Sequence, residues 1–159
     1  MTEKSSVPMT QLEIRKGPDA EIEVGGLRLV ACRREVGGID GGITLYVWAS
    51  PGEGSEDVEV LRCDFFRERP HYHAPAEKQE ENAIDAAEGG SVAWGIEALT
   101  TRAPELAAEA GYSAIGDALD RSALAAAAPA MQSLFDGLEE PNEVSYFDVP
   151  ASVLESLRA

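Results

Sequence analysis

The feature that most constrains this chain is a change in the spacing of its apolar residues near Pro70. Before that point, apolar residues alternate with polar ones in short runs, which is the pattern of half-buried strands. After it, apolar residues recur three or four positions apart, as on one side of a helix. We therefore predict an α+β fold, in which an antiparallel β-meander over residues 11–66 is covered by several short helices within a mostly helical region, residues 76–138.

Length and composition favour a single domain. The chain has 159 residues, of which 44% are hydrophobic, so it can bury a core without disulfide or metal support. No internal repeat and no long linker divides it. We predict one α+β domain over residues 1–159, with residues 1–10 as a flexible N-terminus.

Glycine and proline residues indicate where the elements begin and end. The pair Gly25-Gly26 lies between two alternating runs and predicts a two-residue hairpin turn. Residues 58–69 are expected to form the longest strand. In the second half, a helix is expected from Pro75 to the pair Gly89-Gly90, and Pro104 fits the first turn of a later helix.

The net charge of −16 is unevenly distributed along the chain. Residues 1–78 carry 14 acidic and 10 basic groups, whereas residues 79–159 carry 15 acidic and 3 basic groups. A field of this sign repels phosphate groups, which argues against nucleic acid as a partner. We expect either a basic protein partner, docked on the helical half, or a small anionic ligand; the sequence does not determine the oligomeric state.

The cysteines and the apolar runs bear on the compartment. Cys32 and Cys63 lie in apolar, strand-like stretches without metal-type spacing, so we expect two reduced, buried thiols. No apolar run reaches the roughly 18 residues of a membrane span, and residues 1–11 lack the apolar segment of a secretory signal. We therefore expect a cytoplasmic protein without a membrane anchor.

The chemistry-bearing residues gather between residues 62 and 82, which hold both histidines of the chain. Alternate residues of an extended strand share a face, so a strand continued past residue 66 would present a row of basic and imidazole groups. The expected ligand-binding residues are Arg67, Arg69, His71, Tyr72 and His73. The catalytic candidates are His71, His73 and Asp64.

Three interpretations of this segment stay open. It could be only a polar strand end emerging into solvent. It could hold a metal ion through His71 and His73, completed by a carboxylate from Asp64, Glu77, Glu80 or Glu81. It could also bind an anion or act as an acid–base pair, because arginine forks hold phosphate and carboxylate groups while histidine titrates near neutrality.

We predict the anion rather than the metal, because two adjacent arginines would repel a cation. The function that follows is a non-catalytic binding protein with an anion-binding Arg/His surface and an acidic helical face for a basic partner. The alternatives are a His-dependent enzyme acting on a phosphodiester or related anion, and a His-x-His metal-binding protein. The cofactor stays unknown, since the Gly-rich residues 36–42 match neither a P-loop nor a dinucleotide fingerprint and are expected to form a loop.

Overall fold

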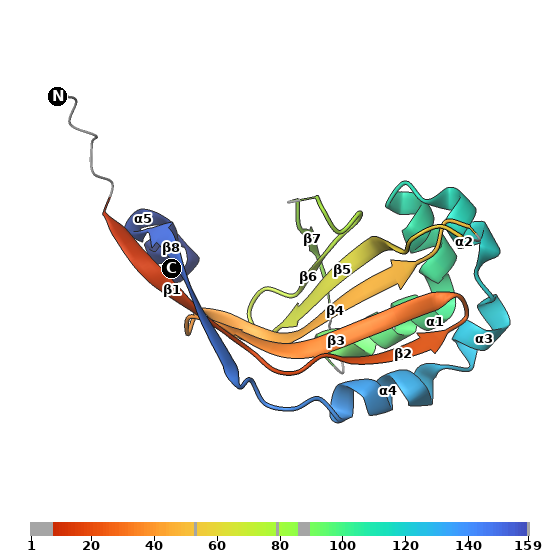
Figure 1. Cartoon of the computed structure of the whole chain (residues 1–159), viewed down its shortest axis with the longest axis horizontal. Helices are drawn as coiled ribbons and strands as arrows, with labels where there is room; N and C mark the ends of the chain where they lie inside the picture. Colours follow the sequence, from red (N-terminus) through yellow and green to blue (C-terminus); the bar gives the residue numbers. More distant parts are fainter. Residues whose placement is uncertain (1–7, 53, 79, 86–89, 159) are drawn as a thin grey trace.

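The computed structural model describes residues 8–52, 54–78, 80–85 and 90–158, and its strands form one antiparallel sheet (Figure 1). The strands within the described residues are β1 (Met9–Lys16), β2 (Ala20–Val24), β3 (Leu27–Val36), β4 (Asp40–Ala49), β5 (Val58–Phe66), β6 (His71–His73), β7 (Asn82–Ala83) and β8 (Glu143–Pro150).

Among the described residues, four helices follow the first seven strands, and a fifth follows β8. They are α1 (Gly90–Glu109), α2 (Ser113–Ala118), α3 (Arg121–Ala125), α4 (Ala128–Asp136) and α5 (Ala151–Arg158). Helix α1 is kinked at Arg102, two residues before Pro104, whose ring cannot continue regular helix hydrogen bonding. Within the described part of the chain, no helix is both long and apolar enough to cross a membrane.

The strand order is β7-β6-β5-β4-β3-β1-β8, and β2 also pairs with β3. Because β4 pairs with β3 along its whole length, β1 and β2 must share the other edge of β3. Strand β2 pairs with residues 27–31 and β1 with residues 34–36. The strands β1 and β8, with α5, extend beyond the rest of the sheet, away from α1–α4 (Figure 1).

One face of the sheet packs against the helices and forms the core. Leu29, Leu45 and Val47 are almost completely buried there, together with Met131 and Phe135 of α4. The polar side chains of β4 and β5 alternate with these core residues and point to the opposite face. That opposite face carries the candidate site.

The structure confirms the α+β class and the β-meander, and no helix occurs among the described residues of 42–66. The hairpin at Gly25-Gly26 is present, since Val24 pairs with Leu27 and both glycines have positive φ angles. Both cysteines are buried and free, as expected.

Three local predictions differ from the structure. The helix expected from Pro75 to Gly90 is not formed in the described residues, which instead make a bend and the short strand β7. Strand β5 ends at Phe66 and is one residue shorter than β3 and β4. Of the N-terminus predicted to be flexible, residues 1–7 lie outside the described residues, whereas Met9 and Thr10 belong to β1.

Candidate functional site

The β5–β6 hairpin decides which side chains meet the two histidines. The chain turns through residues 67–70 and returns as β6, so that Asp64 pairs with His71 and Arg62 with His73. This register places odd-numbered residues of β6 on the same face as even-numbered residues of β5. The histidines therefore face Asp64, whereas Tyr72 lies on the core side and stacks on Trp94 at a ring separation of 5.5 Å.

A buried carboxylate holds this turn in place. Asp40 Oδ1 accepts hydrogen bonds from the backbone N–H groups of Gly41 (2.9 Å) and Glu68 (3.0 Å), and Oδ2 accepts one from Arg69 N (2.8 Å). Asp40 is 6% exposed, so these bonds are shielded from water. The carboxylate thus ties the start of β4 to the loop that leads into the histidine strand.

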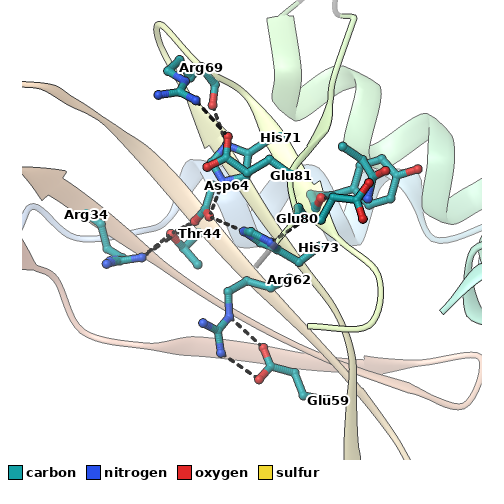
Figure 2. Close-up of polar contacts among 12 residues, drawn as sticks. Arg34, Thr44, Glu59, Arg62, Asp64, Arg69, His71, His73, Glu80 and Glu81 are labelled. Carbon is teal, nitrogen blue, oxygen red and sulfur yellow. Dashed lines mark hydrogen bonds and ion pairs between the residues drawn. The ribbon is translucent and has the colours of Figure 1, made fainter. Parts of the chain in front are cut away.

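The two imidazoles converge on one carboxylate oxygen (Figure 2). Asp64 Oδ2 lies 3.0 Å from His71 Nε2 and 3.9 Å from His73 Nε2. The Nδ1 atoms point elsewhere: His71 Nδ1 is 2.7 Å from the Arg69 carbonyl, and His73 Nδ1 is 3.1 Å from the Glu80 carbonyl. A carbonyl can only accept, so both Nδ1 atoms carry a proton and both Nε2 atoms face Asp64.

The other oxygen of Asp64 is held from the neighbouring strands. Thr44 Oγ1 donates a hydrogen bond to Asp64 Oδ1 over 2.7 Å, and Arg34 Nη1 lies 3.8 Å from the same oxygen. Thr44 is fully buried and pairs directly with Asp64 across β4 and β5. A single row of residues on three strands, Thr44, Asp64 and His71, therefore orients the carboxylate toward the imidazoles.

The electrostatics of the metal-free cluster follow from these contacts. Burial lowers the pKa of His71, but hydrogen bonds with Asp64 and with the Arg69 carbonyl outweigh it, so the net pKa is raised. Burial likewise raises the pKa of Asp64, but hydrogen bonds from His71 and Thr44 outweigh it and leave the pKa lowered. The two opposite shifts each favour the charged form of the group, so protonation of His71 strengthens its contact with the Asp64 carboxylate.

Both arginines expected beside the histidines pair with glutamates, and only Arg69 stays next to His71, because Glu81 Oε1 also lies 3.8 Å from His71 Nδ1. Arg67 makes two hydrogen bonds with Glu35, at 2.9 and 2.7 Å, and Arg69 donates to Glu81 over 3.3 Å. Both guanidinium groups are largely exposed. The structure brings together Asp64 and the two histidines, and it directs the side chains of Arg67, Arg69 and Tyr72 to other partners.

The three converging side chains are close enough together to hold a metal ion. One ligand atom from each of Asp64, His71 and His73 lies within 4.8 Å of the others. Ligand atoms at ~2.0–2.2 Å from a tetrahedral ion are roughly 3.3 Å apart. The separations of 3.0 and 3.9 Å from Asp64 Oδ2 to the two Nε2 atoms bracket that value.

Cavities flank the cluster and give it access to solvent. His73 lines one of about 510 Å³, together with Trp48, Arg62 and Tyr112. His71 lines a second of about 360 Å³ on the other side. The side chains of Asp64, His71 and His73 are only 8–14% exposed, so the site is mostly desolvated yet lies next to open space.

The sequence interpretation did not identify Thr44, Arg34 or Asp40 as parts of the site. Thr44 is a polar residue within the apolar strand of residues 43–49, which was a usable signal. Asp40 lies within the glycine-rich residues 36–42 and Arg34 just before them, and neither belongs to a recognisable motif. The Glu80 carbonyl is a backbone group, so no residue type could reveal its role.

Comparison with known proteins identifies a family but no relative with a known activity. The model of the family described as "Domain of unknown function (DUF7700)" matches residues 21–134. This range contains Asp64, the two histidines and the residues that contact Asp64 Oδ1, Thr44 and Arg34, and it leaves out β1, β8 and α5. No curated protein and no solved structure matches the chain.

Proposed function

We propose that this chain, which belongs to the DUF7700 family of domains of unknown function, is a metal-binding protein that holds a divalent transition metal ion, with zinc favoured, at Asp64, His71 and His73. Imidazole nitrogens and a carboxylate oxygen are typical zinc ligands. The chain's net charge of −16 also favours a cation over an anion at a mostly buried site.

One observation carries this proposal: backbone carbonyls engage both Nδ1 atoms, and both Nε2 atoms face the same carboxylate oxygen. Metal-binding histidines commonly donate their second ring N–H to a carbonyl or carboxylate, which fixes the tautomer and the ring orientation. The hydrogen bond from Thr44 to Asp64 orients the third ligand in the same way. Both the ligands and their supporting partners therefore suit a bound ion.

Three protein ligands leave a tetrahedral ion with one open position, as in catalytic rather than structural zinc sites. A water molecule or a ligand group in that position would be polarised by the ion. The cavity of about 510 Å³ beside His73 offers space for an organic ligand. Metal-assisted hydrolysis is the reaction class that this arrangement supports best.

A second candidate function rests on the ion pair between His71 and Asp64. A carboxylate that orients an imidazole, with His73 nearby at a ring separation of 5.0 Å, is also suited to acid–base catalysis on a phosphodiester or related anion. Simple anion binding through Arg67 and Arg69 has less support, since both are paired with glutamates. A basic protein partner on the acidic helical half stays a separate proposal, motivated by charge alone.

The test is a calorimetric titration of the untagged chain with Zn²⁺ and, separately, with inorganic phosphate. We expect one zinc ion per chain, and an affinity loss of about tenfold or more in each of His71→Ala, His73→Ala and Asp64→Asn. The matched control is Glu80→Gln, because the exposed side chain changes while the carbonyl that binds His73 Nδ1 is kept. Its zinc affinity should equal that of the wild type.

Cobalt substitution reports the ligand set directly. Co²⁺ at this site should show d–d absorption without a thiolate charge-transfer band, because Cys63 faces the core and Cys32 is fully buried. Saturable phosphate binding that persists at high zinc, combined with no zinc binding by the wild type, would refute the metal proposal and favour the anion or acid–base alternatives.

A further inference from the structure

The part of the molecule that the site does not explain is the arm, which we define as β1, β8 and α5 (residues 9–16 and 143–158). Figure 1 shows the arm projecting from the end of the sheet that lies farthest from α1–α4. Every exposed large hydrophobic side chain of the described residues belongs to the arm. These side chains are Met9, Val144, Tyr146, Phe147 and Val153.

Both faces of the arm carry apolar groups. Phe147 pairs with Leu12 on one face, and Tyr146 lies on the other, because neighbouring residues of a strand point to opposite faces. Phe147 is 56% exposed and Tyr146 is 58% exposed. A two-stranded ribbon is only marginally stable in water, so aromatic side chains exposed on both of its faces indicate a surface that is covered in the functional state.

The outer edge of the arm is open to pairing. Strand β8 is the last strand in the order of the described sheet, and β1 is its neighbour on the inner side. Edge strands usually carry lysine, proline or a bulge that blocks further pairing. Strand β8 contains no lysine, its one proline is Pro150 at the last position, and it pairs with β1 through eight consecutive residues without a bulge.

The distribution of charge favours a second copy of the chain as the partner that covers the arm. The arm carries four acidic and three basic groups, a net of −1, whereas the rest of the chain carries −15. Contact through the nearly neutral arms keeps the acidic remainders of two copies apart and so lowers the electrostatic cost of association. Within one copy, the arm places this surface away from α1–α4 (Figure 1).

We propose that β8 pairs antiparallel with β8 of a second copy of this chain and makes a two-fold dimer with one continuous sheet. A two-fold axis perpendicular to the sheet places one residue of β8 opposite itself. In registers centred on Tyr146 or Phe147, neither Glu143 nor Asp148 lies opposite its own copy, so like charges are kept apart. The exposed aromatic rings of the two copies then cover one another.

Sedimentation of the full chain in the presence of a metal chelator tests the dimer independently of the metal site. We expect a species of twice the chain mass of 16.9 kDa, and tighter association as salt screens the repulsion between the two copies. Tyr146→Lys and Phe147→Lys should each weaken dimerisation by about tenfold or more. Ser122→Lys, which adds the same charge at an exposed position on α3, should leave it unchanged.

Disulfide trapping identifies the pairing strand. Residues directly opposite each other across antiparallel strands have Cα atoms ~4.5–5.5 Å apart, within the range of a disulfide. Under mild oxidation, Tyr146→Cys or Phe147→Cys, whichever marks the centre of the register, should form a covalent dimer, while the buried Cys32 and Cys63 do not compete. The proposal is overturned if the wild type stays monomeric at every concentration. It is also overturned if a dimer forms but is neither weakened by the two lysine variants nor trapped by the two cysteine variants.

Discussion

At the scale of single residues, Thr44 has the clearest supporting role in the site. Its hydroxyl donates to Asp64 Oδ1 inside the sheet, where no water can replace it. Thr44→Val keeps the shape but removes this donor. We expect zinc affinity to fall about 10- to 100-fold, the usual effect of losing such a partner of a metal ligand.

Calorimetric titration measures that loss, with Thr100→Val as the matched control. Thr100 Oγ1 donates to carbonyls of its own helix, far from the cluster in sequence and on the opposite layer. An equal loss of affinity in both variants would mean that the effect comes from general destabilisation and not from Asp64.

The His71–Asp64 pair also predicts how the metal-free protein responds to pH. The raised pKa of His71 means that its contribution to stability is complete below its ordinary value of 6.5 and is lost as pH rises through the folded value. The lowered pKa of Asp64 means that its contribution is present above its ordinary value of 3.8 and is lost as pH falls through the folded value.

The pair should therefore stabilise the metal-free fold most strongly between about pH 4 and 6.5. Urea unfolding over a pH series, with chelator present, measures the free energy of unfolding across this window. Asp64→Asn should flatten the profile on the alkaline side, because the group that raises the pKa of His71 is gone. A profile that is identical in the variant would contradict the ion pair.

At the scale of elements, Asp40 connects β4 to the turn before β6. Asp40→Asn replaces one carboxylate oxygen with a donor that cannot accept from Glu68 N or Arg69 N. We expect a loss of about 1–3 kcal/mol in the free energy of unfolding, since buried backbone donors lose their acceptor. Zinc affinity should fall as well, because the same turn positions the histidines.

Chemical denaturation and zinc titration of the variant test both effects. Asp136→Asn is the control, because Asp136 is an exposed helix residue that accepts a hydrogen bond from Gln132 on the same helix. If Asp40→Asn weakened zinc binding without changing stability, the turn would be acting through electrostatics and not through its geometry.

The contact between α1 and β5 depends on the absence of a side chain at Gly95. A Cβ atom there would lie 2.3 Å from Cζ of Phe65, whose ring is buried in the core. Gly95→Ala gains helix propensity of roughly 1 kcal/mol, but the overlap requires α1 or the ring to move, at a cost of about 1–3 kcal/mol. We expect net destabilisation in thermal unfolding.

Phe65→Leu in the same background separates the two effects. The smaller side chain should remove the overlap, so the double variant should be more stable than the sum of the two single changes predicts. Simple additivity would show that α1 moves away freely and that the close approach is not required.

At the scale of the whole molecule, the net charge of −16 acts against the compact state. Screening this self-repulsion with sodium chloride should raise the free energy of unfolding of the metal-free protein, measured with chelator in increasing salt. A basic partner bound to the helical half would show the opposite behaviour, because salt weakens attraction between unlike charges. Salt dependence of each process therefore separates self-repulsion from partner binding.

The sequence by itself determined the class of fold and most of its elements. Alternating apolar residues before Pro70 and helical stripes after it are local patterns. They predicted the meander, the hairpin at Gly25-Gly26 and the helical turn that begins near Pro104, which follows the kink at Arg102. The exception was the segment from Pro75 to Gly90, whose helix-favouring composition was not matched by the structure in its described residues. Among the described residues of that segment, Asn82 and Ala83 pair with β6 as strand β7, so sheet pairing outweighed the local preference there.

Only the tertiary structure decided what surrounds the histidines. The sequence located both of them and named Asp64, but it placed them with Arg67 and Arg69, by extending β5 past Phe66. The turn at residues 67–70 reverses the chain, and the pairing places the odd-numbered residues of β6 on the face of the even-numbered residues of β5. The imidazoles therefore lie next to the Asp64 carboxylate, and Arg67 and Arg69 pair with glutamates. Alternation along a strand is local, whereas the face that a returning strand presents depends on the length of the turn and on Asp40, almost thirty residues away.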